Sequence, residues 1–114
     1  MIRLTNLWQK AVCFFAVENG TVLAFCGAVP LSDGEWELEK MGSNPDVPHR
    51  GAGQAVFTAC MNWALEHGAR RLLIYSNRKL KPALHIYAKC GFREIAVTGA
   101  PYSRADIALE FIPA

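Results

Sequence analysis

The sequence of 114 residues lacks any apolar run long enough to cross a membrane, and its first residues have no apolar core followed by a cleavage site. We therefore expect a soluble, cytoplasmic protein. The sequence also lacks an excess of charge, because 12 basic and 10 acidic residues give a net charge of +2 with the two signs mixed. This balance provides no basic field for nucleic acid, so we expect no nucleic-acid partner and no membrane partner.

The sequence shows no pattern typical of a metal site or of a disulfide framework. Its four cysteines form no C-x-x-C pair and lie within apolar segments, and its three histidines are scattered: Cys13, Cys26, Cys60, Cys90, His49, His67 and His85. We therefore predict buried, reduced thiols and no metal. Internal repeats, low-complexity tracts and linkers are also absent, so residues 1–114 are predicted to form a single domain.

Apolar segments alternate with turn residues in an order that predicts an α/β (α+β) fold. We expect strands at residues 12–17, 21–29, 35–41, 71–75, 92–97 and 105–112, with helices at residues 54–67 and 82–90. Asn19-Gly20 and Ser32-Asp33-Gly34 are typical of hairpin turns. The predicted fold is thus a sheet whose faces are covered by the two helices.

The segment 49–56 is the strongest candidate for a binding loop. Here His49-Arg50-Gly51-Ala52-Gly53 runs directly into the first predicted helix. Glycines let backbone N–H groups approach a ligand closely, and a helix N-terminus favours negative charge, so this arrangement suits a phosphate or pyrophosphate. The glycines alone are equally typical of an ordinary loop before a core helix.

Two common phosphate motifs are excluded at this loop. A Walker A loop requires four residues between its glycines and then Gly-Lys-Ser/Thr, which the sequence does not contain. The dinucleotide pattern G-x-G-x-x-G would begin at Gly51, but its last position is occupied by Val56. A nucleotide-binding function is therefore disfavoured.

Arg50, Gly53 and Ala55 match R-x-x-G-x-A, which resembles the acyl-CoA pyrophosphate loop of the GNAT family of N-acetyltransferases. A later family motif is matched in order by Asn77, Pro82, Ala83, Tyr87, Gly91 and Phe92. Residues 37–41 are similar to the strand that precedes the pyrophosphate loop. The resemblance covers roughly residues 12–112.

The resemblance implies a mixed, mostly antiparallel sheet with a central parallel pair that splays apart, and helices on both faces. The pantetheine arm of acetyl-CoA, the co-substrate, would enter the gap and pair with backbone groups of Met41, Gly42 and Ser43. One of their N–H groups would stabilise the oxyanion. The pyrophosphate would bind Arg50, Gly51, Ala52, Gly53, Gln54 and Ala55.

The resemblance also implies a reaction, namely transfer of the acetyl group to a primary amine of a small molecule or peptide by direct attack in a ternary complex. Tyr87 would protonate the departing thiolate, although a core aromatic would show the same spacing. Glu37 is the candidate base, with Glu39 on the same face as the alternative. Asn77 would hold the pantetheine or the acceptor, or else form a turn after its strand.

The chain departs from the family at its N-terminus. About eleven residues precede the first expected strand, whereas family members begin with another strand and two helices that form one wall of the acceptor site. We therefore expect a short form lacking most of that region, either natural, a fragment, or completed by dimerisation. Leu4, Leu7 and Trp8 would supply an apolar patch for a homodimer. The rival function is a non-catalytic acyl-CoA-binding or interaction domain.

Overall fold

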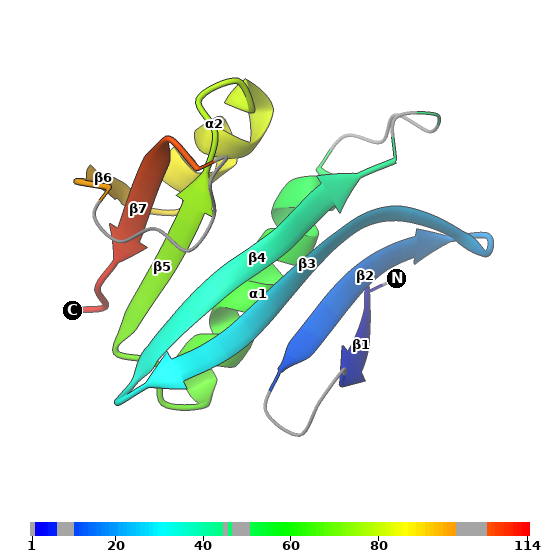
Figure 1. The fold of residues 1–114 in the computed structure, drawn as a ribbon. Coiled ribbons are helices and arrows are strands. Elements are labelled where there is room, and N and C mark those ends of the chain that lie inside the picture. The colour runs from blue at the N-terminus through cyan, green and yellow to red at the C-terminus, as the bar shows by residue number, and fades with distance from the viewer. Residues whose placement is uncertain (1, 7–10, 45, 47–50, 98–104) are drawn as a thin grey trace.

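A computed structural model of the protein describes residues 2–6, 11–44, 46, 51–97 and 105–114. Within these ranges the chain forms seven strands and two helices (Figure 1): β1 (Ile2–Asn6), β2 (Val12–Glu18), β3 (Thr21–Ser32), β4 (Glu35–Ser43), α1 (Ala52–Glu66), β5 (Arg71–Ser76), α2 (Lys81–Lys89), β6 (Arg93–Ile95) and β7 (Ile107–Phe111). From β2 onward these are the elements that the sequence predicts, with boundaries that differ by three residues or fewer.

The described strands form one sheet in the order β1-β2-β3-β4-β5-β7-β6. Only the central pair, β4 and β5, is parallel, and the other neighbours are antiparallel. The predicted mixed, mostly antiparallel sheet with one central parallel pair is therefore confirmed.

Strand β1 was not expected, because we predicted the first strand at residue 12. It pairs antiparallel with β2, from Ile2 opposite Ala16 to Asn6 opposite Val12, and only residues 7–11 separate the two strands. Five residues with a short period-two pattern give a weak local signal, and this strand depends on its neighbour for pairing. Residues 7–10 and the side chains of β1, which include the proposed dimer patch, lie outside the described residues.

Both predicted hairpin turns are confirmed by their backbone. Asn19 and Gly20 have φ values of 50° and 79°, and Asp33 and Gly34 have φ values of 45° and 82°. Two successive residues with positive φ make a turn whose twist matches that of the flanking strands, and Asn-Gly and Asp-Gly tolerate this conformation best.

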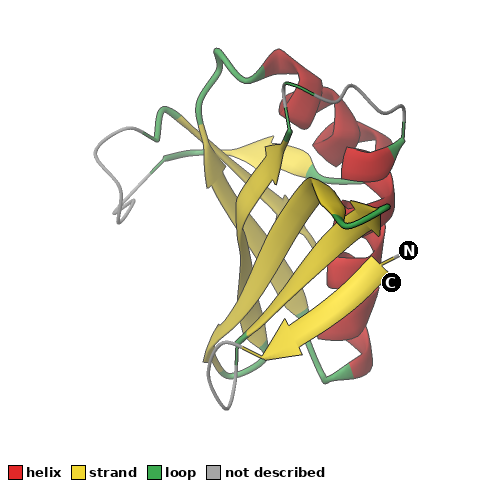
Figure 2. Cartoon of the chain, turned by 90° about the vertical axis from the view of Figure 1, so that its right-hand side faces the viewer, coloured by secondary structure: helices red, strands yellow, loops and turns green. Residues whose placement is uncertain are grey.

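Both helices pack on the same face of the sheet, so the expected cover on both faces is wrong. Figure 2 shows the two helices on one side of the strands. The rings of Phe57 in α1 and Tyr87 in α2 are 5.2 Å apart. The reason lies in the strand order: β4 to β5 and β5 to β6 step in the same direction along the sheet. Right-handed crossovers that step the same way place their helices on the same face.

The core lies between this helical layer and the sheet. Helix α1 buries Val56, Phe57, Cys60 and Ala64, and it exposes the polar residues at positions 58, 62 and 66. Cys13, Cys26 and Cys60 are buried free thiols, as predicted, whereas Cys90 is free but only half-buried. In the described part of the chain, neither helix has the length and apolar character that a membrane crossing requires.

Candidate functional site

The parallel strands β4 and β5 separate after three residue pairs. They pair at Glu35 with Arg71, Trp36 with Leu72, and Glu37 with Leu73. Beyond these pairs β4 stays with β3, and β5 stays with β7, so a gap opens toward the C-terminal ends of both strands. The predicted splayed pair is therefore present.

A β-bulge in β4 lies beside this gap. Phe25 of β3 pairs with Gly42, and Gly27 pairs with Glu39, so residues 40 and 41 of β4 oppose the single residue 26 of β3. A bulge of this kind bends its strand and increases the local twist. The bend falls just beyond the last β4–β5 pair, where the strands diverge.

Two adjoining cavities occupy the region where the strands diverge. The first, of about 460 Å³, is lined by Cys26, Leu38, Glu39, Met41, Phe57, Ile74, Tyr75, Ser76, Asn77, Lys79, Leu80, Tyr87 and Ala105. The second, of about 500 Å³, is lined by Met41, Gly42, Ser43, Gly51, Gly53, Gln54, Leu80, Pro82, Ala83 and Ile86. Met41 and Leu80 line both cavities, so the cavity at the start of α1 and the cavity at Tyr87 are neighbours.

The first turn of α1 borders the second cavity with its amide groups uncapped by any side chain. Gly51 is the N-cap residue, with φ of 83°, and the turn contains no acidic residue. The amides of Ala52, Gly53 and Gln54 have no carbonyl of their own helix to pair with. Unpaired amides at a helix start can bind an anion, which stays a prediction for this loop, and the predicted Arg50 lies outside the described residues.

Gly42 and Gly53, beside the second cavity, differ in whether the fold leaves room for a side chain. A Cβ on Gly42 would lie 2.5 Å from Cζ of Phe25, so a side chain there would require the Phe25 ring to move. A Cβ on Gly53 would lie 3.6 Å from Cδ1 of Ile86 and 3.7 Å from Cε of Met41, which is ordinary contact. The fold therefore does not require glycine at position 53.

Tyr87 lines the first cavity from α2 while being buried at 5% exposure. Burial raises the pKa of its phenol to about 12, assisted by the neighbouring Cys26 and opposed by a hydrogen bond with the Ser76 side chain. The hydroxyl therefore keeps its proton at neutral pH. Tyr87 also packs against Phe57, so it is a core aromatic that also lines the first cavity.

The two candidate glutamates occupy different positions along β4. Glu37 is buried at 5% exposure, is paired with Leu73 of β5, and does not line either cavity. Glu39 is half-buried and lines the first cavity. Of the two, Glu39 has the better position for a base.

Asn77 lines the first cavity and also stabilises the turn that follows β5. Its Oδ1 accepts a hydrogen bond from the backbone N–H of Lys79 at 2.9 Å, and its carbonyl accepts one from Leu80 at 2.9 Å. The two readings of Asn77 left open by the sequence are therefore compatible.

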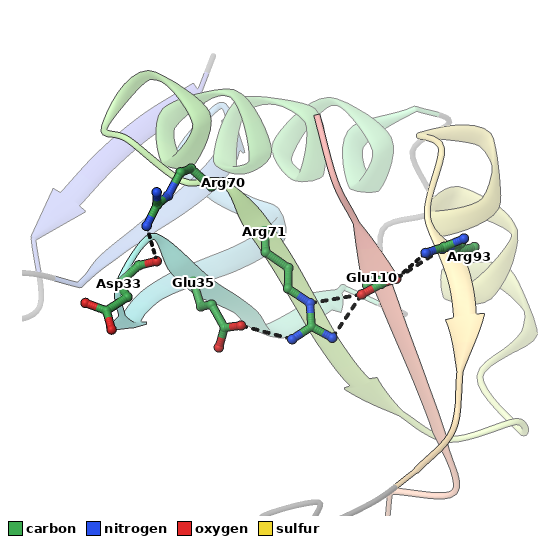
Figure 3. Close-up of polar contacts among 6 residues, drawn as sticks. All are labelled: Asp33, Glu35, Arg70, Arg71, Arg93 and Glu110. Atoms are coloured by element: carbon green, nitrogen blue, oxygen red, sulfur yellow. Dashed lines mark hydrogen bonds and ion pairs between the residues drawn. The ribbon is translucent and has the colours of Figure 1, made fainter. Parts of the chain in front are cut away.

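An ion cluster that we did not foresee joins the four strands of the C-terminal half of the sheet (Figure 3). Arg71 donates to Glu35 and to Glu110, each at 2.9 Å, and Arg93 donates to Glu110 at 2.7 Å. Hydrogen bonds from Arg93, and then from Arg71, hold the pKa of Glu110 below its ordinary value. Because Glu35 and Arg71 are the first pair of the parallel strands, the cluster lies at the closed end of the gap.

Among the described residues, no three histidine, cysteine or acidic side chains lie together as metal ligands would. The site offers instead backbone amides, an apolar passage, a phenol and a carboxylate. This arrangement suits an extended anionic ligand that presents a reactive group beside Tyr87 and Glu39.

The chain is similar to a known protein family and to a curated protein. A model of the acetyltransferase (GNAT) family matches residues 1–92. The mycothiol acetyltransferase of Clavibacter sepedonicus is 29% identical over 104 residues, which cover 90% of this chain and 34% of that protein. The chain thus spans about a third of the length of this curated relative.

Solved structures share the fold at low sequence identity. A Bacillus subtilis acetyltransferase in complex with CoA has a TM-score of 0.80 at 14% identity, with 99% of this chain and 98% of that chain covered. The PaiA N-acetyltransferase of Thermoplasma acidophilum, in complex with coenzyme A, has a TM-score of 0.76 at 17% identity, with 91% and 62% covered.

Proposed function

The chain belongs to the acetyltransferase (GNAT) family, and from this premise we propose that it transfers the acetyl group of acetyl-CoA to a primary amine of a small molecule or peptide. The attack is direct and takes place in a ternary complex. The observation that carries the proposal is the pair of neighbouring cavities, one at the uncapped start of α1 and one lined by Tyr87, which share Met41 and Leu80 in their walls.

The cofactor is proposed to occupy both cavities. Its pyrophosphate binds the first-turn amides of α1, where the helix dipole favours negative charge. Its pantetheine arm runs along Met41, Gly42 and Ser43 and hydrogen-bonds to their backbone as an added strand would. Two structural neighbours solved with coenzyme A support this cofactor, one of which has nearly all of its length covered by this chain.

Two protons must move for the reaction to balance. The acceptor ammonium gives one to Glu39, directly or through water, and the free amine then attacks the thioester carbon. Collapse of the intermediate breaks the C–S bond, and the amide nitrogen loses its second proton as the sulfur gains one. A backbone N–H of residues 41–43 is proposed to stabilise the oxyanion.

Tyr87 is proposed to meet the departing sulfur. A thiol has an ordinary pKa of about 8.5, well below the value of about 12 for this buried phenol. The phenol therefore donates a hydrogen bond to the thiolate. Complete transfer of its proton is unfavourable, because the phenol has the higher pKa. Stabilisation of the leaving group by this hydrogen bond lowers the barrier in either case.

Calorimetric titration with acetyl-CoA, followed by measurement of coenzyme A release with a panel of amines, tests the proposal. Binding with amine-dependent release is the expected result. Binding without release for any amine would favour a non-catalytic acyl-CoA-binding domain. Absence of binding would refute the cofactor assignment.

We also propose that the protein acts as a cytoplasmic homodimer. Light scattering over a range of concentrations tests the assembly. A stable monomer at every concentration would refute the homodimer.

A further inference from the structure

The segment from residue 67 to residue 93 carries basic side chains but no acidic ones. It contains seven arginines and lysines and no acidic residue: Arg70, Arg71, Arg78, Lys79, Lys81, Lys89 and Arg93. The four arginines are engaged within the fold by acidic side chains or, for Arg70, by the carbonyl of Asp33. The lysines therefore concentrate positive charge on and just before α2.

Helix α2 presents three basic side chains along one exposed stripe. Lys81, His85 and Lys89 follow at intervals of four residues, which places them on the same side of a helix, and all three are exposed. Pro82 and Ile86, adjacent to this stripe on the helix surface, line the second cavity. The basic stripe thus runs along the edge of that cavity.

The basic stripe contacts the first turn of α1 through one hydrogen bond. Nζ of Lys89 lies 3.4 Å from Oε1 of Gln54, a residue of the first turn of α1 and of the second cavity. A lysine ammonium has three N–H donors, so this contact leaves donors for an anion at the cavity mouth. The first-turn amides and the Lys89 ammonium therefore offer two neighbouring anion positions.

We propose that Lys89, supported by His85 and Lys81, forms a subsite for the 3′-phosphate on the adenosine of coenzyme A. The inference rests on the proposed function, since the pyrophosphate must occupy the start of α1 for the adenosine to emerge here. A phosphomonoester carries between one and two negative charges at neutral pH, and lysine binds phosphate as a point charge. The subsite gives the protein a preference for coenzyme A over its 3′-dephospho form.

Calorimetric titration of the wild-type protein with coenzyme A and with 3′-dephospho-coenzyme A tests the subsite. The expected result is five- to tenfold tighter binding of coenzyme A, with a ratio that decreases as salt is added because exposed charges are screened. Lys89→Ala should bring the ratio close to one by weakening coenzyme A alone. Equal affinities in the wild type, or an equal loss for both ligands in the variant, would overturn the subsite.

Arg70→Ala is the matched control, because it removes the same unit of charge beyond the opposite end of α1. A helix of 15 residues is about 22 Å long, so Arg70 is remote from Gln54. Its ligand ratio should equal that of the wild type, and a ratio near one would show that net charge alone sets the preference, which refutes the subsite. Failure of both ligands to bind the folded wild type would refute the proposed function as well.

Discussion

Replacement of Gly53 by alanine should raise stability and weaken cofactor binding at the same time. Gly53 is the second residue of α1, and a Cβ there meets only ordinary contacts with Ile86 and Met41. Glycine within a helix costs about 0.5–1 kcal/mol relative to alanine, through the greater freedom of the unfolded chain. With no steric term against it, Gly53→Ala should recover most of this free energy and raise Tm by about 2–4 °C.

The same methyl group should obstruct the ligand. It projects toward Ile86 and Met41, both of which line the second cavity, and so lies where the cofactor must approach the first-turn amides. A loss of one close phosphate contact corresponds to at least a tenfold weaker affinity, or about 1.4 kcal/mol. Thermal unfolding without ligand and calorimetry with acetyl-CoA measure the two effects separately.

Gly51→Ala provides the matched comparison at the neighbouring glycine. Gly51 has φ of 83°, and a Cβ there meets no atom of the described residues within 4 Å, so alanine is disfavoured by its left-handed conformation and not by contact with them. This should lower stability by about 1–2 kcal/mol. Should Gly53→Ala also lower stability, the argument from free space would be wrong, and unchanged acetyl-CoA affinity would refute the placement of the pyrophosphate.

Three further predictions concern the acceptor side and the ion cluster. Tyr87→Phe should bind acetyl-CoA normally and lose turnover by about 10²–10³-fold on a confirmed acceptor, the usual effect of removing one donor to a developing charge, and a loss of only a few-fold would make Tyr87 a packing residue. Glu39→Gln should lower turnover more than Glu37→Gln at equal cofactor affinity, and the reverse order in steady-state kinetics would make Glu37 the base. Glu110→Gln should cost about 1–2 kcal/mol at neutral pH, judged by urea midpoints. Because the native pKa of Glu110 is lowered, its contribution is present above the ordinary carboxyl pKa and disappears as pH falls through the lowered value. The difference from wild type should therefore close in acid, and a difference independent of pH would contradict the ion-pair account.

Local sequence signals were sufficient for most elements of the fold. The turns at Asn19-Gly20 and Asp33-Gly34 depend on the positive φ that these residue types tolerate, so the residue types alone predict them. Helix α1 was predictable because its polar residues recur every four positions and its other side chains are apolar. The helix begins at Ala52, two residues before the predicted start, because Gly51 takes the N-cap position with positive φ.

Features that depend on pairing between distant segments were not predictable in this way. The packing of both helices on one face follows from the strand order, which places β7 between β5 and β6. The ion cluster joins Arg71 to Glu110, residues 39 positions apart, through a register that no local pattern encodes. Each of these charges alone is typical of a solvated strand face.

The choice between Glu37 and Glu39 shows where sequence reasoning ends at this site. Period-two alternation predicts the same face of β4 for the two side chains, so no local argument can separate them. The difference is that β5 still pairs with β4 at Glu37, opposite Leu73, and has left it by Glu39. The carboxylate at position 37 therefore lies over a closed part of the sheet, whereas that at position 39 borders the opening where an acceptor amine would meet the thioester.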